Sequence, residues 1–239
     1  MRADTSDDSL VGYPRIKMVG SFDELIGTPF RDGVNALCWR RELPGDFAAV
    51  VRAVGALDEI TTIDDESLRA LDLSAAGRVA RDILLEDQRL LQAHGLSPIL
   101  DCIPAYPRDV SDEPVPTDVY SFHVDSATTE TDTWLCTYHG ASSEGLSNEA
   151  AIRRVDVPAT RAALLKAYGG QDDADFRIYL AEHCYDLHYV PQSNAQLFAF
   201  GVGNLWRIAT AWPGCLVPPC IHRAPATRQG HPPRLLLIS

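Results

Sequence analysis

Hydrophobic and polar positions divide the chain into an N-terminal part with helical periodicity and a C-terminal part of short strand-like runs. Residues 1–30 show little periodicity and are expected to form an irregular arm, followed by a short buried strand over 35–39. Helices are predicted after Asp46 as an N-cap, over 64–71, and over 74–92. The last of these has an apolar face made of Val79, Ile83, Leu84, Leu90 and Leu91.

From about residue 98 the pattern changes to short runs rich in β-branched and aromatic residues. Residues 159–168 interrupt these runs as a helix, which Val157-Pro158 begins and Gly169 ends. Helices followed by many strands predict an α+β, mainly β fold, and either a jelly roll or an open antiparallel sheet satisfies the pattern. The predicted strands are 119–124, 133–138, 152–155, 176–180, 184–190, 197–202, 205–209, 219–222 and 234–238.

The formal net charge of −12 makes nucleic acid and anionic membranes poor partners. The charge is uneven, because no Asp or Glu occurs after Asp186. The final 53 residues carry +4 through Arg207, Arg223, Arg228 and Arg234. This segment is either mostly buried strand, where acids are rare, or the lining of a pocket for an anion such as a carboxylate.

The polar, acidic N-terminus is unlike a signal peptide, and no apolar run reaches the roughly 18 residues that a membrane helix needs. The six cysteines include no CxxC pair. A cytoplasmic protein with reduced, mostly buried thiols is therefore expected. The sequence leaves open whether the protein is a monomer or a homodimer.

His123 and Asp125 lie two positions apart at the end of a predicted strand. At this spacing both side chains leave the same face of the strand, while Val124 points the other way into the core. Two imidazoles and one carboxylate form the facial arrangement that holds iron(II) and leaves coordination positions open. His222 is the best-placed second histidine, because it ends a short apolar run late in the β region.

The order HxD, distant histidine, arginine resembles the iron(II)/2-oxoglutarate-dependent oxygenases, whose core is a cupin-like double-stranded β-helix. In that family an arginine after the second histidine binds the far carboxylate of 2-oxoglutarate, and Arg234 follows His222 by twelve residues. The rigid fork of arginine matches a carboxylate inside an apolar pocket. On the predicted strand, Leu236 and Ile238 share the face of Arg234.

The resemblance covers about half the chain and implies a single domain, 1–239. Residues 1–117 would form the arm and the helical layer, and residues 118–239 the jelly-roll metal-binding core. Two features depart from compact members of the family. The 96 residues between Asp125 and His222 require an insertion, and Leu236 stands where the family often has serine.

Four further residues are expected at the pocket. Tyr138 would hydrogen-bond a carboxylate of the co-substrate and Trp134 would wall the pocket, although alternate residues of this strand also fit an ordinary core. Asn204 and Arg207 precede the region of His222. Arg207 would contact an acidic substrate or pair with an acid of the N-terminal half.

A second group of possible metal ligands surrounds His183 and His188. These two histidines are five positions apart, which fits neither one face of a strand nor one face of a helix. Cys184, Asp186 and His188 do alternate on a predicted strand, and would form a zinc site with Cys136 or His139.

By this resemblance, the expected function is a non-haem iron(II) oxygenase that uses 2-oxoglutarate and oxidises a small polar or anionic metabolite. One alternative is an iron oxygenase in which the substrate itself chelates the metal and Arg234 binds that substrate. Another is a non-catalytic jelly-roll protein that binds a structural zinc ion or another ligand. Motifs such as GxSxG, GxxxxGK[ST], HExxH and GxGxxG do not occur in the sequence.

Overall fold

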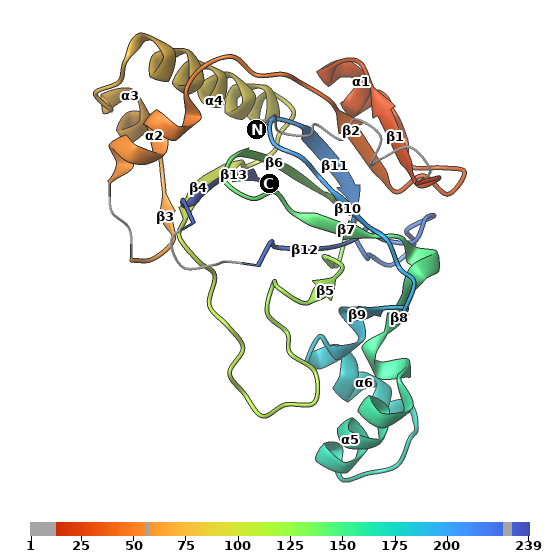
Figure 1. Ribbon diagram of the computed structural model, residues 1–239. Coiled ribbons are helices and arrows are strands. Elements are labelled where there is room, and N and C mark those ends of the chain that lie inside the picture. The colour runs from red at the N-terminus through yellow and green to blue at the C-terminus, as the bar shows by residue number, and fades with distance from the viewer. Residues whose placement is uncertain (1–12, 56–57, 227–230) are drawn as a thin grey trace.

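The computed structural model describes residues 13–55, 58–226 and 231–239. Strands outnumber helices in this part of the chain and form two sheets (Figure 1). The seven-stranded sheet contains, in spatial order, β1 (Ile16–Val19), β2 (Ala36–Trp39), β11 (Leu205–Ala209), β6 (Asp132–His139), β13 (Arg234–Ile238), β4 (Ile99–Ile103) and β3 (Thr61–Thr62). The six-stranded sheet contains β10 (Leu197–Ala199), β7 (Glu144–Leu146), β12 (Ile221–Arg223), β5 (Phe122–His123), β9 (His188–Pro191) and β8 (Ala151–Arg153).

Most neighbouring strands are antiparallel, although β1 and β2 pair in parallel. Four strands from the first part of the β region pair with four from the last part: β4 with β13, β5 with β12, β6 with β11, and β7 with β10. Both sheets thus contain strands that are distant in sequence. Strands on both sides of residue 118 share the seven-stranded sheet, so the N-terminal part supplies strands as well as helices.

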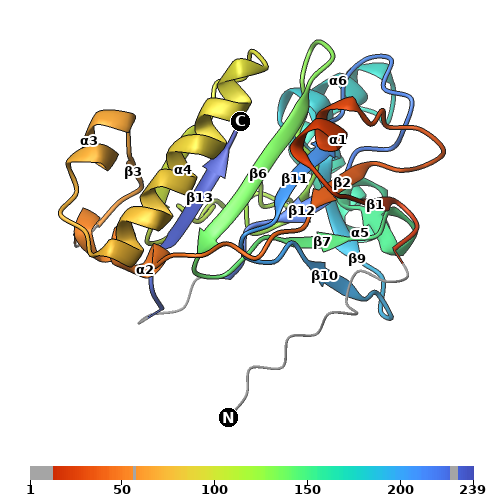
Figure 2. The same ribbon diagram turned by 90° about the horizontal axis from the view of Figure 1, so that it is seen from above.

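The helices lie in two groups. The first is α1 (Phe22–Gly27), α2 (Phe47–Val54), α3 (Asp65–Ala70) and α4 (Ala75–Ala93), and the second is α5 (Pro158–Tyr168) and α6 (Ala174–Glu182). In Figure 2, α4 runs alongside β13 and β6. Side chains of α1–α4 and of the seven-stranded sheet form one apolar cluster, which includes Leu84, Leu91, Leu235 and Leu237.

The helices predicted after Asp46, over 64–71, over 74–92 and over 159–168 are confirmed with small shifts of their ends. The side chains of Asp46, Asp64 and Ser74 each accept a hydrogen bond from the backbone three residues later, which satisfies a free N–H of the first turn. The buried face of α4 differs from the predicted one, because Val79 is 43% exposed and the charged Asp87 is buried.

The largest differences from the predicted elements are at residues 176–180 and in the N-terminal arm. Residues 176–180 form part of α6 instead of a strand, because the Asp173 carboxylate caps the helix by accepting from the N–H groups of Asp175 and Phe176. The described part of the expected arm, residues 13–30, contains β1 and α1. Residues 1–12 of that arm lie outside the described residues.

The expected insertion between Asp125 and His222 corresponds to the segment from β8 to β9, which includes α5 and α6. Its strand β9 pairs with β5, and β8 pairs with β9, so the insertion widens the six-stranded sheet on the side of β5. The two helices lie beyond this edge (Figure 1). Val115, from the long loop before β5, belongs to one apolar cluster with Leu164 of α5 and Phe176 of α6. The insertion and this loop therefore form one wall beside β5.

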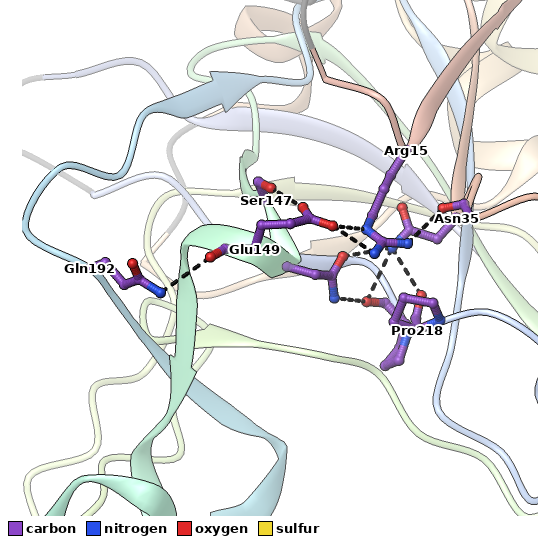
Figure 3. A network of polar contacts seen from close by, with 9 residues as sticks. Arg15, Asn35, Ser147, Glu149, Gln192 and Pro218 are labelled. Carbon is purple, nitrogen blue, oxygen red and sulfur yellow. Dashed lines mark hydrogen bonds and ion pairs between the residues drawn. The ribbon is translucent and has the colours of Figure 1, made fainter.

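A polar network joins the start of the seven-stranded sheet to the segment before β12 (Figure 3). The Asn35 side-chain amide donates to Asn148 Oδ1 and to the carbonyl of Pro218, both at 2.9 Å. Arg15 Nε donates to Glu149 Oε1 at 2.7 Å. Because Asn35 is buried, these bonds hold the chain that leads into β12 against both sheets.

None of the described helices combines the length and apolar character needed to cross a bilayer. The six cysteines form no disulfide, and Cys38, Cys102, Cys136 and Cys220 are buried.

Candidate metal centre

One row of residues crosses the six-stranded sheet. Phe198 lies opposite Gly145, Gly145 opposite His222, His222 opposite His123, and His123 opposite His188. Residues directly opposite one another in antiparallel strands project from the same face of the sheet. The row therefore places His123 and His222 side by side, with ring centroids 4.7 Å apart.

His123, Asp125 and His222 offer ligand atoms that all lie within 4.8 Å of one another, as their sequence pattern predicts. Nε2 of His123 lies 3.8 Å from Asp125 Oδ1, and Nε2 of His222 lies 3.7 Å from Asp125 Oδ2. Two ligand atoms bound to one ion at about 2.1 Å are at most about 4.2 Å apart, so both distances fit a shared ion. The alternate residue Val124 is buried on the opposite face of the sheet, as predicted.

Both histidines are oriented for metal binding by the backbone. Nδ1 of His123 lies 2.8 Å from the Ser121 carbonyl, and Nδ1 of His222 lies 3.4 Å from the Cys220 carbonyl. A carbonyl accepts only, so the proton belongs on Nδ1 and the lone pair of Nε2 faces the cluster. Burial, together with His222, lowers the pKa of His123 to about 4, so this imidazole is neutral at pH 7.

Asp125 is held in the ionised state by its neighbours. Burial acts to raise the pKa of its carboxyl group, but His222, the Thr133 hydroxyl and His123 outweigh burial and lower it below the usual value. Thr133 Oγ1 donates to Asp125 Oδ2 at 2.5 Å. The Asp125 side chain is 32% exposed, against 14% for His123 and 10% for His222, so solvent reaches the cluster from the carboxylate side.

Replacing Thr133 by valine is expected to lower metal affinity about tenfold, at the lower end of the roughly 10–100-fold effects of lost outer hydrogen bonds. The substitution removes the bond that orients Asp125 but keeps the side-chain shape. Titration of the purified protein with Fe(II) under anaerobic conditions measures the effect. Thr137→Val, on the same face of β6, is the matched control and is expected to leave metal affinity unchanged. Equal affinity in wild type and Thr133→Val would contradict the role of Thr133.

Arg234 is buried on the face of the seven-stranded sheet that points toward the six-stranded sheet. Its guanidinium donates to three hydroxyl groups: Ser143 at 2.7 Å, Thr137 at 2.9 Å and Tyr106 at 3.3 Å. Its Nε is buried without a hydrogen-bond partner, and no carboxylate of the described residues forms an ion pair with it. Burial lowers the pKa of Arg234. A buried cation that lacks an anionic partner is costly unless a ligand supplies one.

A cavity of about 260 Å³ lies beside this arginine. Arg234 and Tyr106 line it together with Ile103, Pro104 and Gly140, among other residues. His123, Asp125 and His222 are not in its lining. The cavity therefore gives access to the surroundings of Arg234, and the metal ligands lie outside it.

The structure does not bring Tyr138 and Trp134 to this cluster, which corrects the expectation that they line the pocket. Both belong to the apolar cluster under the helices, and Tyr138 donates its hydroxyl to Asp87 of α4 at 2.5 Å. The opposite set of β6 residues, Thr133 and Thr137, faces Asp125 and Arg234. Because both faces of β6 are buried, its sequence does not reveal which alternate set faces the site.

Arg207 and Asn204 are also placed away from the ligands. Arg207 pairs with Asp132 at 2.7 Å, and it donates to the carbonyls of Leu25, Ile26 and Thr28 at the end of α1. Asn204 accepts from the backbone N–H of Arg41. Arg223 pairs with Glu144, so Arg207 and Arg223 are neutralised within the fold, whereas Arg234 meets hydroxyl groups alone.

The alternative zinc site is not assembled. Residues 185–187 form a 3₁₀ turn, preceded by Cys184 at φ 58°, so Cys184, Asp186 and His188 do not alternate on one strand. Cys184 is exposed, whereas Cys136 is buried in the cluster beneath the helices. In the described part of the chain, His123, Asp125 and His222 form the one group of metal-ligand type.

In comparisons with known proteins, no family model, curated protein or solved structure matches the chain. The site must therefore be interpreted from its own residues. Sequence reasoning missed Thr133, Thr137, Ser143 and Tyr106. The spacing of Thr133 and Thr137 on one strand was the available signal, because it places both hydroxyls on one face.

Proposed function

We propose that the protein is a non-haem iron(II) oxygenase that uses 2-oxoglutarate and oxidises a small polar or anionic metabolite. The observation that carries the proposal is the buried Arg234, which has no anionic partner among the described residues and contacts Thr137 on the face of β6 that also carries Thr133, the partner of Asp125. A co-substrate with a metal-binding end and a distal carboxylate needs a metal site and a carboxylate site. The His–Asp–His cluster is the candidate for the first and Arg234 is the candidate for the second.

The strand pairing supports a double-stranded β-helix, or jelly roll. If β4, β5, β6, β7, β10, β11, β12 and β13 are numbered one to eight, the first four pair with the last four in reverse order. This is the pairing of one long hairpin, and consecutive strands alternate between the two sheets except at its tip, β7 to β10. Rolling such a hairpin produces two facing four-stranded sheets. The remaining strands extend these sheets at their edges.

The spacing of the two sites fits a five-carbon dicarboxylate. Thr133 contacts Asp125 and Thr137 contacts Arg234, and these threonines are four residues apart on β6. At about 3.3 Å per residue, they are separated by about 13 Å. An extended five-carbon diacid, with a metal bond at one end and a hydrogen bond at the other, spans on the order of 11 Å. The two lengths are of the same order, as a ligand bound at both sites requires.

Each part of the chain has a chemical role in this proposal. When bound, iron(II) supplies the activation of O₂, by which 2-oxoglutarate is converted to succinate and CO₂ while a substrate C–H bond becomes C–OH. His123, Asp125 and His222 hold the ion and leave coordination positions for ligands. Arg234, Thr137 and Ser143 orient the distal carboxylate. The apolar residues between the sheets, including Leu135, Trp206 and Leu236, restrict the access of water.

Anaerobic titration with Fe(II) and then 2-oxoglutarate tests the proposal. Chelation by the 2-oxo acid is expected to give a visible metal-to-ligand charge-transfer band in wild type and none in His123→Ala. Absence of the band in wild type, with unchanged Fe(II) affinity in His123→Ala, would reject it. Oxygen consumption without succinate formation would instead favour an oxygenase whose substrate chelates the metal directly.

Replacing Arg234 by glutamine is expected to raise the 2-oxoglutarate concentration that gives half of the charge-transfer band by roughly 10–100-fold, since a buried charged hydrogen bond is worth about 1.5–3 kcal/mol. Fe(II) affinity, measured separately, should stay near that of wild type. Arg223→Gln is the matched control, because Arg223 pairs with Glu144 and contacts Phe122 on the other face of the six-stranded sheet. An unchanged 2-oxoglutarate titration in Arg234→Gln would exclude this arginine as the carboxylate site.

A further inference from the structure

His188 extends the row of the metal ligands by one strand. It lies opposite His123, with ring centroids 5.9 Å apart, and it is 4% exposed. Its Nδ1 atom is buried without a hydrogen-bond partner. Burial, and then the neighbouring His123, lower the pKa of His188. A buried polar atom without a partner costs free energy, and this one lies beside the candidate metal centre.

Arg154 directly follows the last paired residue of β8. Arg153 lies opposite Tyr189 of β9, which is next to His188, and Arg154 begins the 3₁₀ turn that comes after β8. Its Nε is also buried without a partner, and no ion pair of its guanidinium occurs among the described residues. Arg154 contributes to the low pKa of His188, as expected for neighbours. Two side chains of the insertion, one just after β8 and one at the start of β9, thus have buried nitrogen atoms with no hydrogen-bond partner.

The charges around this pair favour a singly charged ligand. Asp118 and Asp109 act on the pKa of His188 from the long loop before β5, and Asp118 also acts on that of Arg154, but Asp118 already accepts from the backbone N–H groups of Tyr120, Ser121 and Asp109. One guanidinium fork matches one carboxylate bidentately, and the unpartnered Nδ1 of His188 adds one further hydrogen bond. A doubly charged phosphate would be less well compensated, with two acids close by.

We infer that Arg154 and His188 form the substrate subsite and bind the carboxylate of a small monocarboxylic acid that is oxidised at the neighbouring cluster. The inference rests on the proposed function, because it takes the substrate to react at His123, Asp125 and His222. Neighbouring strands are about 4.8 Å apart, so His188 lies about 5 Å from His123 along the row, and Arg154 belongs to the segment on the far side of His188. The subsite would therefore hold the carboxylate on the side of the metal ligands that the insertion forms, several bonds away from the carbon that is oxidised.

Acetate is the probe for this subsite. The metal-free protein is titrated with acetate at constant ionic strength, with chloride as the balancing anion, and the ring C–H resonance of His188 is followed by NMR. Its loss in His188→Gln assigns the resonance. A saturable shift is expected in wild type. The affinity for acetate should be at least tenfold lower in Arg154→Gln. It should fall less in Arg154→Lys, because lysine keeps the charge without the fork. Thermal unfolding of each variant verifies that it is folded.

Arg153→Gln is the matched control. Arg153 is exposed and pairs with Asp156, so its replacement should leave the acetate titration unchanged. Arg234→Gln should also retain the His188 shift, because that arginine belongs to the other site. No saturable shift in wild type, or a shift that survives in Arg154→Gln, would overturn the inference. Inorganic phosphate binding more tightly than acetate would overturn the carboxylate assignment. Because neither metal nor 2-oxoglutarate is present, failure of the proposed function would leave this result unaffected.

Discussion

Replacing His222 by alanine is expected to lower the Fe(II) affinity more than about 100-fold, beyond the range for lost outer-shell bonds, and to abolish metal-dependent oxygen consumption. The imidazole of His222 supplies one of the three protein ligands. The remaining two, His123 and Asp125, form too few metal–ligand bonds to compete with water for the ion. Anaerobic Fe(II) titration measures the affinity. The rise in unfolding temperature on adding Fe(II) gives an independent readout, because a ligand that binds only the folded state stabilises it. That rise should disappear in His222→Ala.

His183→Ala is the control for this experiment. His183 is an exposed histidine at the end of α6, where its Nδ1 contacts the Tyr179 carbonyl, and it lies outside the cluster. Its loss should change neither the affinity nor the thermal shift. Full retention of Fe(II) binding in His222→Ala would show that the metal is bound elsewhere. Loss of Fe(II) binding in His183→Ala would indicate that the alternative ligand group around residues 183–188 binds the metal.

Replacing Asp87 by alanine is expected to destabilise the protein by about 3–5 kcal/mol, the usual cost of removing one member of a buried ion pair. Asp87 lies on α4 and pairs with Arg41 at 2.7 Å, and these side chains are 4% and 8% exposed. It also accepts the Tyr138 hydroxyl at 2.5 Å. The substitution leaves a buried guanidinium and a buried hydroxyl without their acceptor. Urea unfolding followed by circular dichroism measures the change in the free energy of unfolding.

Asp82→Ala provides the comparison on the same helix. Asp82 is exposed and pairs with Arg81, so its removal should change the free energy of unfolding by no more than about 0.5 kcal/mol. The double variant Arg41→Met/Asp87→Leu should be less destabilised than Asp87→Ala, because no uncompensated charge remains in the core. A loss below about 1 kcal/mol in Asp87→Ala would contradict a structural role for the pair.

Local features of the fold were predictable where the interactions that produce them lie within a short segment of the chain. The N-caps at Asp46, Asp64 and Ser74 depend on side chains three residues from their partners. The two faces of β13 follow from simple alternation, with Arg234 and Leu236 toward the six-stranded sheet and Leu235 and Leu237 toward the helices. The helix over 174–182 was missed, because its apolar residues have high strand propensity and the Asp173 cap was not recognised.

The sequence by itself determined the ligand types and the local geometry of the candidate site, because the alternation of a strand places His123 and Asp125 on one face. The convergence of His222 with them required the pairing of β12 with β5, which joins residues distant in the chain. Tertiary structure alone decided that Thr133 and Thr137, instead of Trp134 and Tyr138, face the interior, since both faces of β6 are buried. It also placed His188 opposite His123, because the register between separate strands depends on packing that no single segment encodes.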